Sequence, residues 1–365
     1  MTELETPQQA GFRMPAEWAP HEATWIAWPH NPEDWPGRFQ PIPWVYCDIV
    51  RALAKVEQVH ILVNDAAAEK RVRSLLKRTG AKLAAVHFHQ WPTNRIWTRD
   101  SGPIFVQNAQ QEVAITNWHF NAWAKYNDWQ LDDALPGRAA ELLALPEWQP
   151  RVAMSANGEA AEHRVVLEGG SIDTNGAGVL LTTEECLLSD VQARNPGLSR
   201  AQLEQVFHDY LGIDQVLWLN RGIAGDDTHG HVDDITRFVN ERTIVTVVEP
   251  NTADENHLPL AENLDRLHAA RALDGEPFRI ATLPCPAPVV FEGQRLPASY
   301  ANFYIANGLV LVPTFNDPND RIALQTLAEL FPAHVIQGTH CGDFIWGLGA
   351  LHCMTQQQPA GNKGT

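Results

Sequence analysis

Cys353 lies near the C-terminal end of the chain, shortly after the glycine-rich segment Gly347-Leu348-Gly349. A cysteine thiolate is a strong nucleophile, and it forms at neutral pH beside a cation or a helix dipole. The glycines would let the backbone approach a bound molecule closely. Most free cysteines are structural residues of the core, so a catalytic role for Cys353 depends on which other groups the chain supplies.

His231 and Asp233 are separated by one residue at the end of the segment 225–233, GDDTHGHVD. If this stretch is extended, the two side chains point to the same face, because side chains alternate along a strand. A histidine in that position could protonate a departing ammonia and then deprotonate a water molecule. An isolated His-x-Asp is more often part of a polar loop, so this pair gains meaning only with the rest of the set.

Two further carboxylates stand beside small residues, Asp100 before Ser101-Gly102-Pro103 and Glu168 before Gly169-Gly170. Each one alone is equally well explained as a residue that caps a turn. Together with Asp233 they could bind a planar guanidinium cation through bidentate, charge-assisted hydrogen bonds and hold its carbon over a thiolate. A thiol, an imidazole and three carboxylates are therefore the set expected of a hydrolase that modifies guanidines.

The overall charge is consistent with a small cationic ligand. The chain has 365 residues with 27 basic and 44 acidic side chains, a formal net charge of -17. Phosphate binding needs clustered lysine and arginine, so this balance argues against nucleic acid as a partner. An acidic protein attracts cations such as amines and guanidines, although acidity is also a common solubility feature.

The cysteines and the N-terminus indicate a reducing compartment. There are five cysteines and no Cys-x-x-Cys pair, so neither a disulfide framework nor a thiolate zinc cluster is predicted. The N-terminal residues are polar, and no apolar run reaches the roughly 18 residues of a membrane helix. We expect a cytoplasmic protein with no membrane partner, and we leave a homo-oligomer open.

Strand and helix patterns alternate from end to end, which predicts a mixed α and β class. Short runs rich in Val, Ile, Leu and Trp predict strands at 24–28, 59–63, 102–106, 178–182, 243–248 and 308–312. Helical periodicity predicts helices at 46–56, 66–79, 199–211 and 321–331. In the third, Ser199 and Gln202 fit a capping box and Gly212 a helix end. Residues 153–163 are small and polar and are expected to form a surface loop. A glycine turn followed by a strand recurs loosely, which is weak evidence for internal repeats.

Taken together, the motifs resemble the agmatine deiminase family, also called the Porphyromonas-type peptidylarginine deiminase family. The matching stretches are 14–29 (MPAEWAPHEATWIAWP), 97–103 (WTRDSGP), 118–123 (WHFNAW), 167–171 (LEGGS), 181–188 (LTTEECLL), 225–233 (GDDTHGHVD), 298–308 (ASYANFYIANG) and 352–357 (HCMTQQ). They extend over nearly the whole chain, and their joint occurrence is specific where any one motif would not be.

The resemblance implies one α/β domain over residues 1–365, a pentein, which is a five-bladed α/β propeller with pseudo-fivefold symmetry and a central active site. It makes Cys353 the nucleophile and His231 the general acid and base. Asp100 and Asp233 would hold the guanidinium, Glu168 would line the site and orient His231, and Trp97 would form a wall. The implied reaction converts agmatine and water to N-carbamoylputrescine and ammonia through a covalent thiouronium intermediate, with no metal or organic cofactor.

Several alternatives stay open at this stage. Leu348 stands where agmatine-specific members have glycine, and His229 where they tend to have asparagine, so free or peptidyl arginine remains a candidate substrate. His229-Gly-His231-Val-Asp233 also resembles a ligand run of dinuclear zinc hydrolases, which would make the protein a metallohydrolase. A binding protein for cationic ligands would need the carboxylates but neither Cys353 nor His231.

Overall fold

The computed structural model describes residues 5–156 and 159–362. Within them, five mixed sheets share one pattern, in which the second strand pairs antiparallel with the first and parallel with the third. Four of these sheets are β4 (Ile104–Gln107), β5 (Val113–Thr116) and β6 (Glu147–Trp148); β9 (Asp173–Thr174), β10 (Val179–Thr183) and β11 (Gln215–Leu219); β12 (Thr236–Asn240), β13 (Thr243–Val248) and β14 (Arg279–Pro284); and β17 (Tyr304–Ala306), β18 (Leu309–Thr314) and β19 (Val335–His340). The fifth joins the two ends of the chain, with β20 (Gln356–Pro359) beside β1 (His21–Ala27), β2 (Gln58–Leu62) and β3 (Val86–His89).

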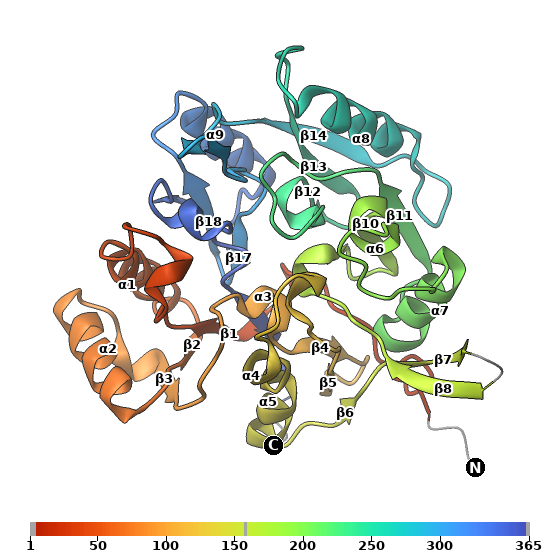
Figure 1. Ribbon diagram of the computed structural model, residues 1–365, viewed down its shortest axis with the longest axis horizontal. Coiled ribbons are helices and arrows are strands. Elements are labelled where there is room, and N and C mark those ends of the chain that lie inside the picture. Colours follow the sequence, from red (N-terminus) through yellow and green to blue (C-terminus); the bar gives the residue numbers. More distant parts are fainter. Residues whose placement is uncertain (1–4, 157–158, 363–365) are drawn as a thin grey trace.

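Helices connect the strands that pair in parallel, because a parallel pair needs a crossover that a tight turn cannot supply. They are α1 (Ile42–Leu53), α2 (Ala66–Arg78), α4 (Gln130–Asp133), α5 (Leu135–Leu143), α6 (Glu184–Leu188), α7 (Arg200–Leu211), α8 (His257–Ala269) and α9 (Asn319–Leu330). Figure 1 shows the five sheets arranged around the short helix α3 (Thr98–Ser101), with α1, α2, α9, α8, α7 and α5 on the outside. Each sheet therefore has an outer helical layer and one end near the centre.

The local signals of the sequence are confirmed at most of these elements. The six predicted strands correspond to β1, β2, β4, β10, β13 and β18, and the four predicted helices to α1, α2, α7 and α9, with ends that shift by up to four residues. Helix α7 begins with the predicted capping box, since the Ser199 and Gln202 side chains each bond the other's backbone. It ends at Gly212, whose φ of 66° is a left-handed conformation that glycine adopts without strain.

The apolar core is divided among the sheets and their helices. One cluster packs α1 against β1 and β2, a second packs α8 and α9 against β13 and β18, and a third packs α7 against β5 and β10. This burial is the main source of stability for such layers. Because the apolar clusters lie between the sheets and their helices, polar side chains can gather at the centre, around α3.

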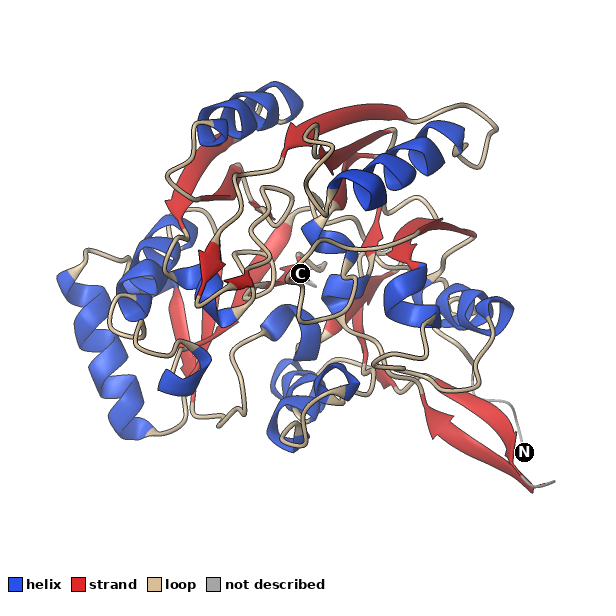
Figure 2. Cartoon of the chain, turned by 45° about the horizontal axis from the view of Figure 1, so that its top comes forward, coloured by secondary structure: helices blue, strands red, loops and turns tan. Residues whose placement is uncertain are grey.

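The prediction of a surface loop at residues 153–163 is wrong. Residues 153–156 and 159–163 belong to the antiparallel strands β7 (Arg151–Ala156) and β8 (Glu159–Arg164), and residues 157–158 lie outside the described part of the chain. The small and polar residues of these strands give only a weak strand signal, because few of them are large and apolar. Figure 2 shows the two strands extending away from the other sheets. None of the helices in the described ranges has the length and apolar character needed to cross a membrane.

Candidate active site

Five short segments converge at the centre, each placed just before the first strand of one sheet. They are α3 before β4, the single helical turns η4 (Gly169–Ser171) before β9 and η5 (Val232–Asp234) before β12, the turn at Asn302 before β17, and the turn at Cys353 before β20. Hydrogen bonds link them, from Gly170 N to Asp100 Oδ1, from Arg99 N to the Cys353 carbonyl, and from Asn302 Nδ2 to Cys353 Sγ. The repeated strand pattern thus brings side chains from the whole length of the chain to one place.

His231 and Asp233 reach this place by a backbone path that differs from the one expected. His231 caps η5, so the extended conformation considered for His231-Val232-Asp233 is wrong. The helical turn still directs both side chains into one cluster, with His231 Nδ1 4.0 Å from Asp233 Oδ1. The helical turn before β12 thus brings the side chains of His231 and Asp233 to the same cluster, as an extended segment would also have done.

His231 lies buried among three carboxylates. Its Nδ1 is 3.7 Å from Asp100 Oδ1 and its Nε2 is 3.8 Å from Glu168 Oε2, and neither ring nitrogen has a hydrogen-bond partner in the described part of the chain. Burial is the largest single effect and opposes protonation, but Asp100, Cys186 and Glu168 together outweigh it and raise the pKa of His231 well above its usual value. The imidazole is therefore poised to carry and deliver a proton.

Among the described residues, His231 is the one cationic group within ion-pair distance of the Asp100 carboxylate. Its Oδ2 accepts a hydrogen bond from Trp123 Nε1 at 2.9 Å, and its Oδ1 accepts one from Gly170 N at 3.1 Å. Burial raises the pKa of Asp100 to about 6, and the nearby carboxylates of Asp233 and Glu168 act in the same direction. A cationic group bound next to Asp100 would relieve this unfavourable burial of charge.

Glu168 is held by an arginine that the sequence did not single out. Its Oε1 accepts a hydrogen bond from Arg194 Nε at 3.0 Å, and both side chains are fully buried. Burial alone would raise the pKa of Glu168, but the Arg194 guanidinium and His231 together lower it to about 2. Glu168 is thus a fixed negative charge whose free oxygen, Oε2, faces His231.

Cys353 lies next to the carboxylates and is 6% exposed. Its Sγ accepts a hydrogen bond from Asn302 Nδ2 at 3.1 Å and lies 3.9 Å from Asp233 Oδ2. Burial raises the pKa of the Cys353 thiol well above its usual value, and Asp233, Asp234 and Asp100 raise it further. The thiol is therefore protonated in the free protein, and a bound cation would favour its ionisation.

Gly170 leaves a space between the groups of this cluster. A Cβ atom at position 170 would lie 2.6 Å from His231 Nδ1, 2.7 Å from Asp100 Oδ1 and 3.1 Å from Asp233 Oδ2. Real Cβ atoms essentially never approach other atoms as closely as the first two distances. The glycine is required because three polar side chains converge on the position that any side chain would occupy.

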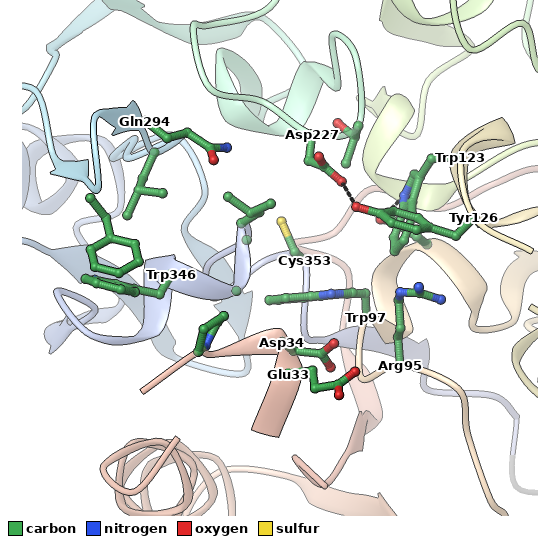
Figure 3. A pocket seen from close by; sticks show the side chains of 18 of the residues that line it. Glu33, Asp34, Arg95, Trp97, Trp123, Tyr126, Asp227, Gln294, Trp346 and Cys353 are labelled. Carbon is green, nitrogen blue, oxygen red and sulfur yellow. Dashed lines mark hydrogen bonds between the residues drawn. The ribbon is translucent and has the colours of Figure 1, made fainter. Parts of the chain in front are cut away.

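A cavity of about 480 Å³ opens onto this cluster (Figure 3). Cys353, Asp100, Trp97 and Trp123 line its inner part, and the Cys353 sulfur points into the open space. More exposed side chains line the outer part, among them Glu33, Asp34, Arg95, Tyr126, Asp227, Glu292, Gln294 and Trp346. His231, Asp233 and Glu168 do not belong to the lining and lie buried behind it. Of the six residues predicted for the site, three therefore form the wall and three support it.

Comparison with known proteins agrees with this geometry. Residues 13–359 match the Porphyromonas-type peptidyl-arginine deiminase family. The chain belongs to this family. It is 35% identical to an agmatine deiminase of Pseudomonas syringae, over all of both chains. The agmatine deiminase of Enterococcus faecalis superimposes with a TM-score of 0.87 and 30% identity, over 98% of both chains. A cysteine-to-serine variant of the C. jejuni agmatine deiminase with substrate bound gives 0.83 and 28%, over 96% of this chain and 97% of that one.

Two groups of donor atoms in the described part of the chain could hold a metal ion. One contains Glu168, Cys186 and His231, and the other contains Asp233, Asp234 and Cys353, with donor atoms within 4.8 Å of one another in each. His229, the other histidine of the zinc-like run, belongs to neither group, and its Nε2 lies 3.2 Å from Ser189 Oγ. In the described part of the chain, neither group therefore contains both histidines of the zinc-like run.

Sequence reasoning missed several members of the cluster. Arg194, Asn302 and Glu17 were not selected, because a lone arginine, asparagine or glutamate carries no local signal of a site. Asn302 lies in one of the stretches that carry the family resemblance, which was the available hint. His352 was visible as an unusual polar neighbour of Cys353, but its contacts could not be inferred from its position alone.

Proposed function

We propose that this protein hydrolyses agmatine to N-carbamoylputrescine and ammonia. The observation that carries the proposal is the convergence of a thiol, a buried imidazole and two unlike carboxylates beside one cavity with an acidic outer wall. The family and the full-length similarity to agmatine deiminases support the same reaction. The chemistry requires no metal or organic cofactor.

In the first stage, Asp100 and Asp233 bind the guanidinium and hold its central carbon against Cys353. The positive charge of the substrate offsets the carboxylates that keep the Cys353 thiol protonated, so the thiolate becomes accessible. A bond forms between sulfur and carbon, the bond from carbon to one terminal nitrogen breaks, and ammonia leaves. His231, which is protonated at the start, gives its proton to that ammonia, and the proton that the thiol loses passes to solvent. A cationic thiouronium remains on Cys353.

In the second stage, His231 accepts a proton from a water molecule, whose oxygen attacks the thiouronium carbon. The bond between carbon and sulfur then breaks, which releases the ureido product and returns the Cys353 thiol. The second proton of the water molecule ends on the Cys353 sulfur, and ammonia takes up the proton released to solvent in the first stage. Glu168 stabilises the protonated form of His231 through its fixed charge. Trp97 contributes an apolar wall that limits access of bulk water to the reacting carbon.

The outer wall favours a substrate tail that carries an amine over one that carries a carboxylate. Glu33, Asp34 and Glu292 contribute negative charge there, whereas Asp227 is already paired with Lys125 and Arg95 with Asp128. Asp34 Oδ2 is buried and has no hydrogen-bond partner among the described residues, and burial raises the pKa of Asp34 to about 6. We infer that Asp34 receives the terminal ammonium of agmatine. The carboxylate of arginine would be repelled by the same groups.

We also infer that the five sheets are the blades of a pentein propeller with pseudo-fivefold symmetry, in a single domain over residues 1–365. The support is the shared strand pattern of the five sheets and the equivalent positions of the five converging segments. A family that matches from residue 13 to residue 359 agrees with one domain rather than two.

The test is ammonia release from agmatine, free arginine and a blocked peptidyl arginine, with wild type beside Cys353→Ala and with a chelator control. We expect turnover of agmatine, loss of turnover in the variant with an unchanged melting temperature, and no effect of the chelator. Turnover by Cys353→Ala would eliminate the nucleophile, and turnover of arginine alone would change the substrate. Binding of agmatine without ammonia release would indicate a binding protein.

A further inference from the structure

His352 lies between two carboxylates in the buried layer behind the cavity. Its Nδ1 is 2.6 Å from Asp233 Oδ2 and its Nε2 is 2.7 Å from Glu17 Oε2, and the residue is 1% exposed. An ionised carboxylate can only accept hydrogen bonds, so both ring nitrogens must donate. A neutral imidazole has one donor, and two such contacts therefore define an imidazolium cation.

The other contacts of Glu17 favour the ionised state that this geometry requires. Glu17 Oε2 also accepts a hydrogen bond from Arg237 Nη2 at 2.6 Å, and its Oε1 accepts one from Ile305 N at 2.8 Å. Burial opposes ionisation of Glu17, but Arg237 and His352 lower its pKa far below the usual range. Burial likewise opposes ionisation of Asp233, and the hydrogen bond from His352 lowers its pKa.

The charges form an alternating chain that ends at the site. It runs from Arg237 through Glu17 and His352 to Asp233. The hydrogen bond from His352 occupies Asp233 Oδ2, whereas Asp233 Oδ1 has no hydrogen-bond partner among the residues that the structure describes and faces His231. Alternating charges at hydrogen-bond distance stabilise one another in a buried setting. The side chain of Asp233 is therefore fixed in orientation as well as in charge.

We propose that His352 is a positioning residue, a buried imidazolium that keeps Asp233 ionised and presents its free oxygen to the guanidinium of the substrate. This inference rests on the proposed deimination of a guanidine. The contrast with Asp100 supports it, because Asp100 accepts hydrogen bonds from the neutral N–H groups of Trp123 and Gly170, whereas His231 lies 3.7 Å from its Oδ1, beyond hydrogen-bond distance. Of the two carboxylates that bind the guanidinium, Asp233 is thus ionised before substrate binds, and Asp100 becomes fully ionised when the cationic substrate binds.

Other charged groups act on this pair from the surrounding elements. On the Glu17 side they are Arg99 of α3, Asp173 of β9, Arg237 of β12 and the Tyr304 hydroxyl of β17. On the Asp233 side they are Asp100, His231, Asp234 and Cys353. Arginines on the first side are already paired with carboxylates, so none of them replaces His352 as the donor to Asp233.

The test compares His352→Gln with wild type and with His21→Gln. Glutamine can donate one neutral hydrogen bond but carries no charge. His21 is a matched control, because it is buried, contacts the Glu17 carbonyl and Glu57, and lies outside the catalytic cluster. We expect His352→Gln to raise KM for agmatine at least about tenfold, more than it lowers kcat, and to move the acid limb of the kcat/KM profile to higher pH by about one unit or more. His21→Gln should lower the melting temperature without moving that limb.

An acid limb and KM unchanged in a folded His352→Gln variant would overturn the inference. A second measurement does not depend on the variant being stable. Nitrogen-15 spectra of histidine-labelled wild type at about pH 8 should show two imidazolium rings with both nitrogens protonated and restricted exchange, that of His231, whose pKa is also raised, and that of His352. A neutral ring at His352 would refute the assignment. If wild type failed to deiminate agmatine, the proposed function would be lost, and the nitrogen spectra would still decide the charge of His352.

Discussion

Gly170→Ala is the substitution for which the structure gives the clearest quantitative expectation. The backbone φ of Gly170 lies outside the left-handed region, so an alanine there adopts the same backbone without strain. Its Cβ, however, would lie 2.6 Å from His231 Nδ1 and 2.7 Å from Asp100 Oδ1, whereas ordinary contacts begin at 3.4 Å. Each of these atoms must therefore retreat by roughly 0.7 to 0.8 Å, close to the displacement of about 1 Å that costs a catalytic site about 100-fold in rate.

We expect kcat/KM for agmatine to fall about 100-fold in Gly170→Ala, which corresponds to about 2.7 kcal/mol of transition-state stabilisation. The assay is initial-rate ammonia release, with thermal unfolding followed by circular dichroism to verify that the variant is folded. The matched control is Gly137→Ala in α5, where the nearest atom to a new Cβ is 3.6 Å away. This control should keep full activity and gain up to about 1 kcal/mol of stability, because alanine favours a helix over glycine.

A folded Gly170→Ala variant with kcat/KM within about threefold of wild type would refute the reasoning, since a threefold change is below 1 kcal/mol. It would mean either that the cluster relaxes freely around an added methyl group or that the guanidinium binds elsewhere. Loss of activity in Gly137→Ala would instead show that glycine substitutions disturb the fold in general.

Further predictions concern charge. Because the pKa of Asp100 is raised to about 6 and substrate binding needs its carboxylate, the affinity of the Cys353→Ser variant for agmatine should weaken as pH falls below about 6, and calorimetry that shows constant affinity down to about pH 5 would exclude Asp100 from the grip. Arg194→Met leaves the buried Glu168 charge unpaired and should destabilise the protein by about 3–5 kcal/mol in urea unfolding. Adding Glu168→Gln should recover part of that loss, and equal stability of the single and double variants would contradict the pairing. Asp34→Asn should raise KM for agmatine about tenfold but leave butylguanidine, which lacks the amine, unchanged, and an equal effect on both substrates would remove Asp34 from tail recognition.

Local sequence signals determined the elements whose stability depends on near neighbours. The capping box of Ser199 and Gln202, the left-handed Gly212 and the apolar runs of β13 and β18 are properties of a few consecutive residues. They could be predicted because such signals act over one turn or one strand. The same reasoning failed for the paired strands β7 and β8, whose small and polar residues give only a weak strand signal, and for His231-Val232-Asp233, which forms a helical turn just before β12.

The sequence by itself determined which chemical groups the protein has, and its family motifs selected Cys353, His231, Asp233, Asp100 and Glu168 as a set. Only the tertiary structure decided how those groups are charged. The charge of each depends on partners that are distant along the chain, such as Arg194 for Glu168 and Glu17 for His352. Burial and neighbouring charges govern the pKa of an ionisable group, and both arise only when the five segments meet. No local pattern could therefore reveal that the pKa of Asp233 is lowered while that of Asp100 is raised.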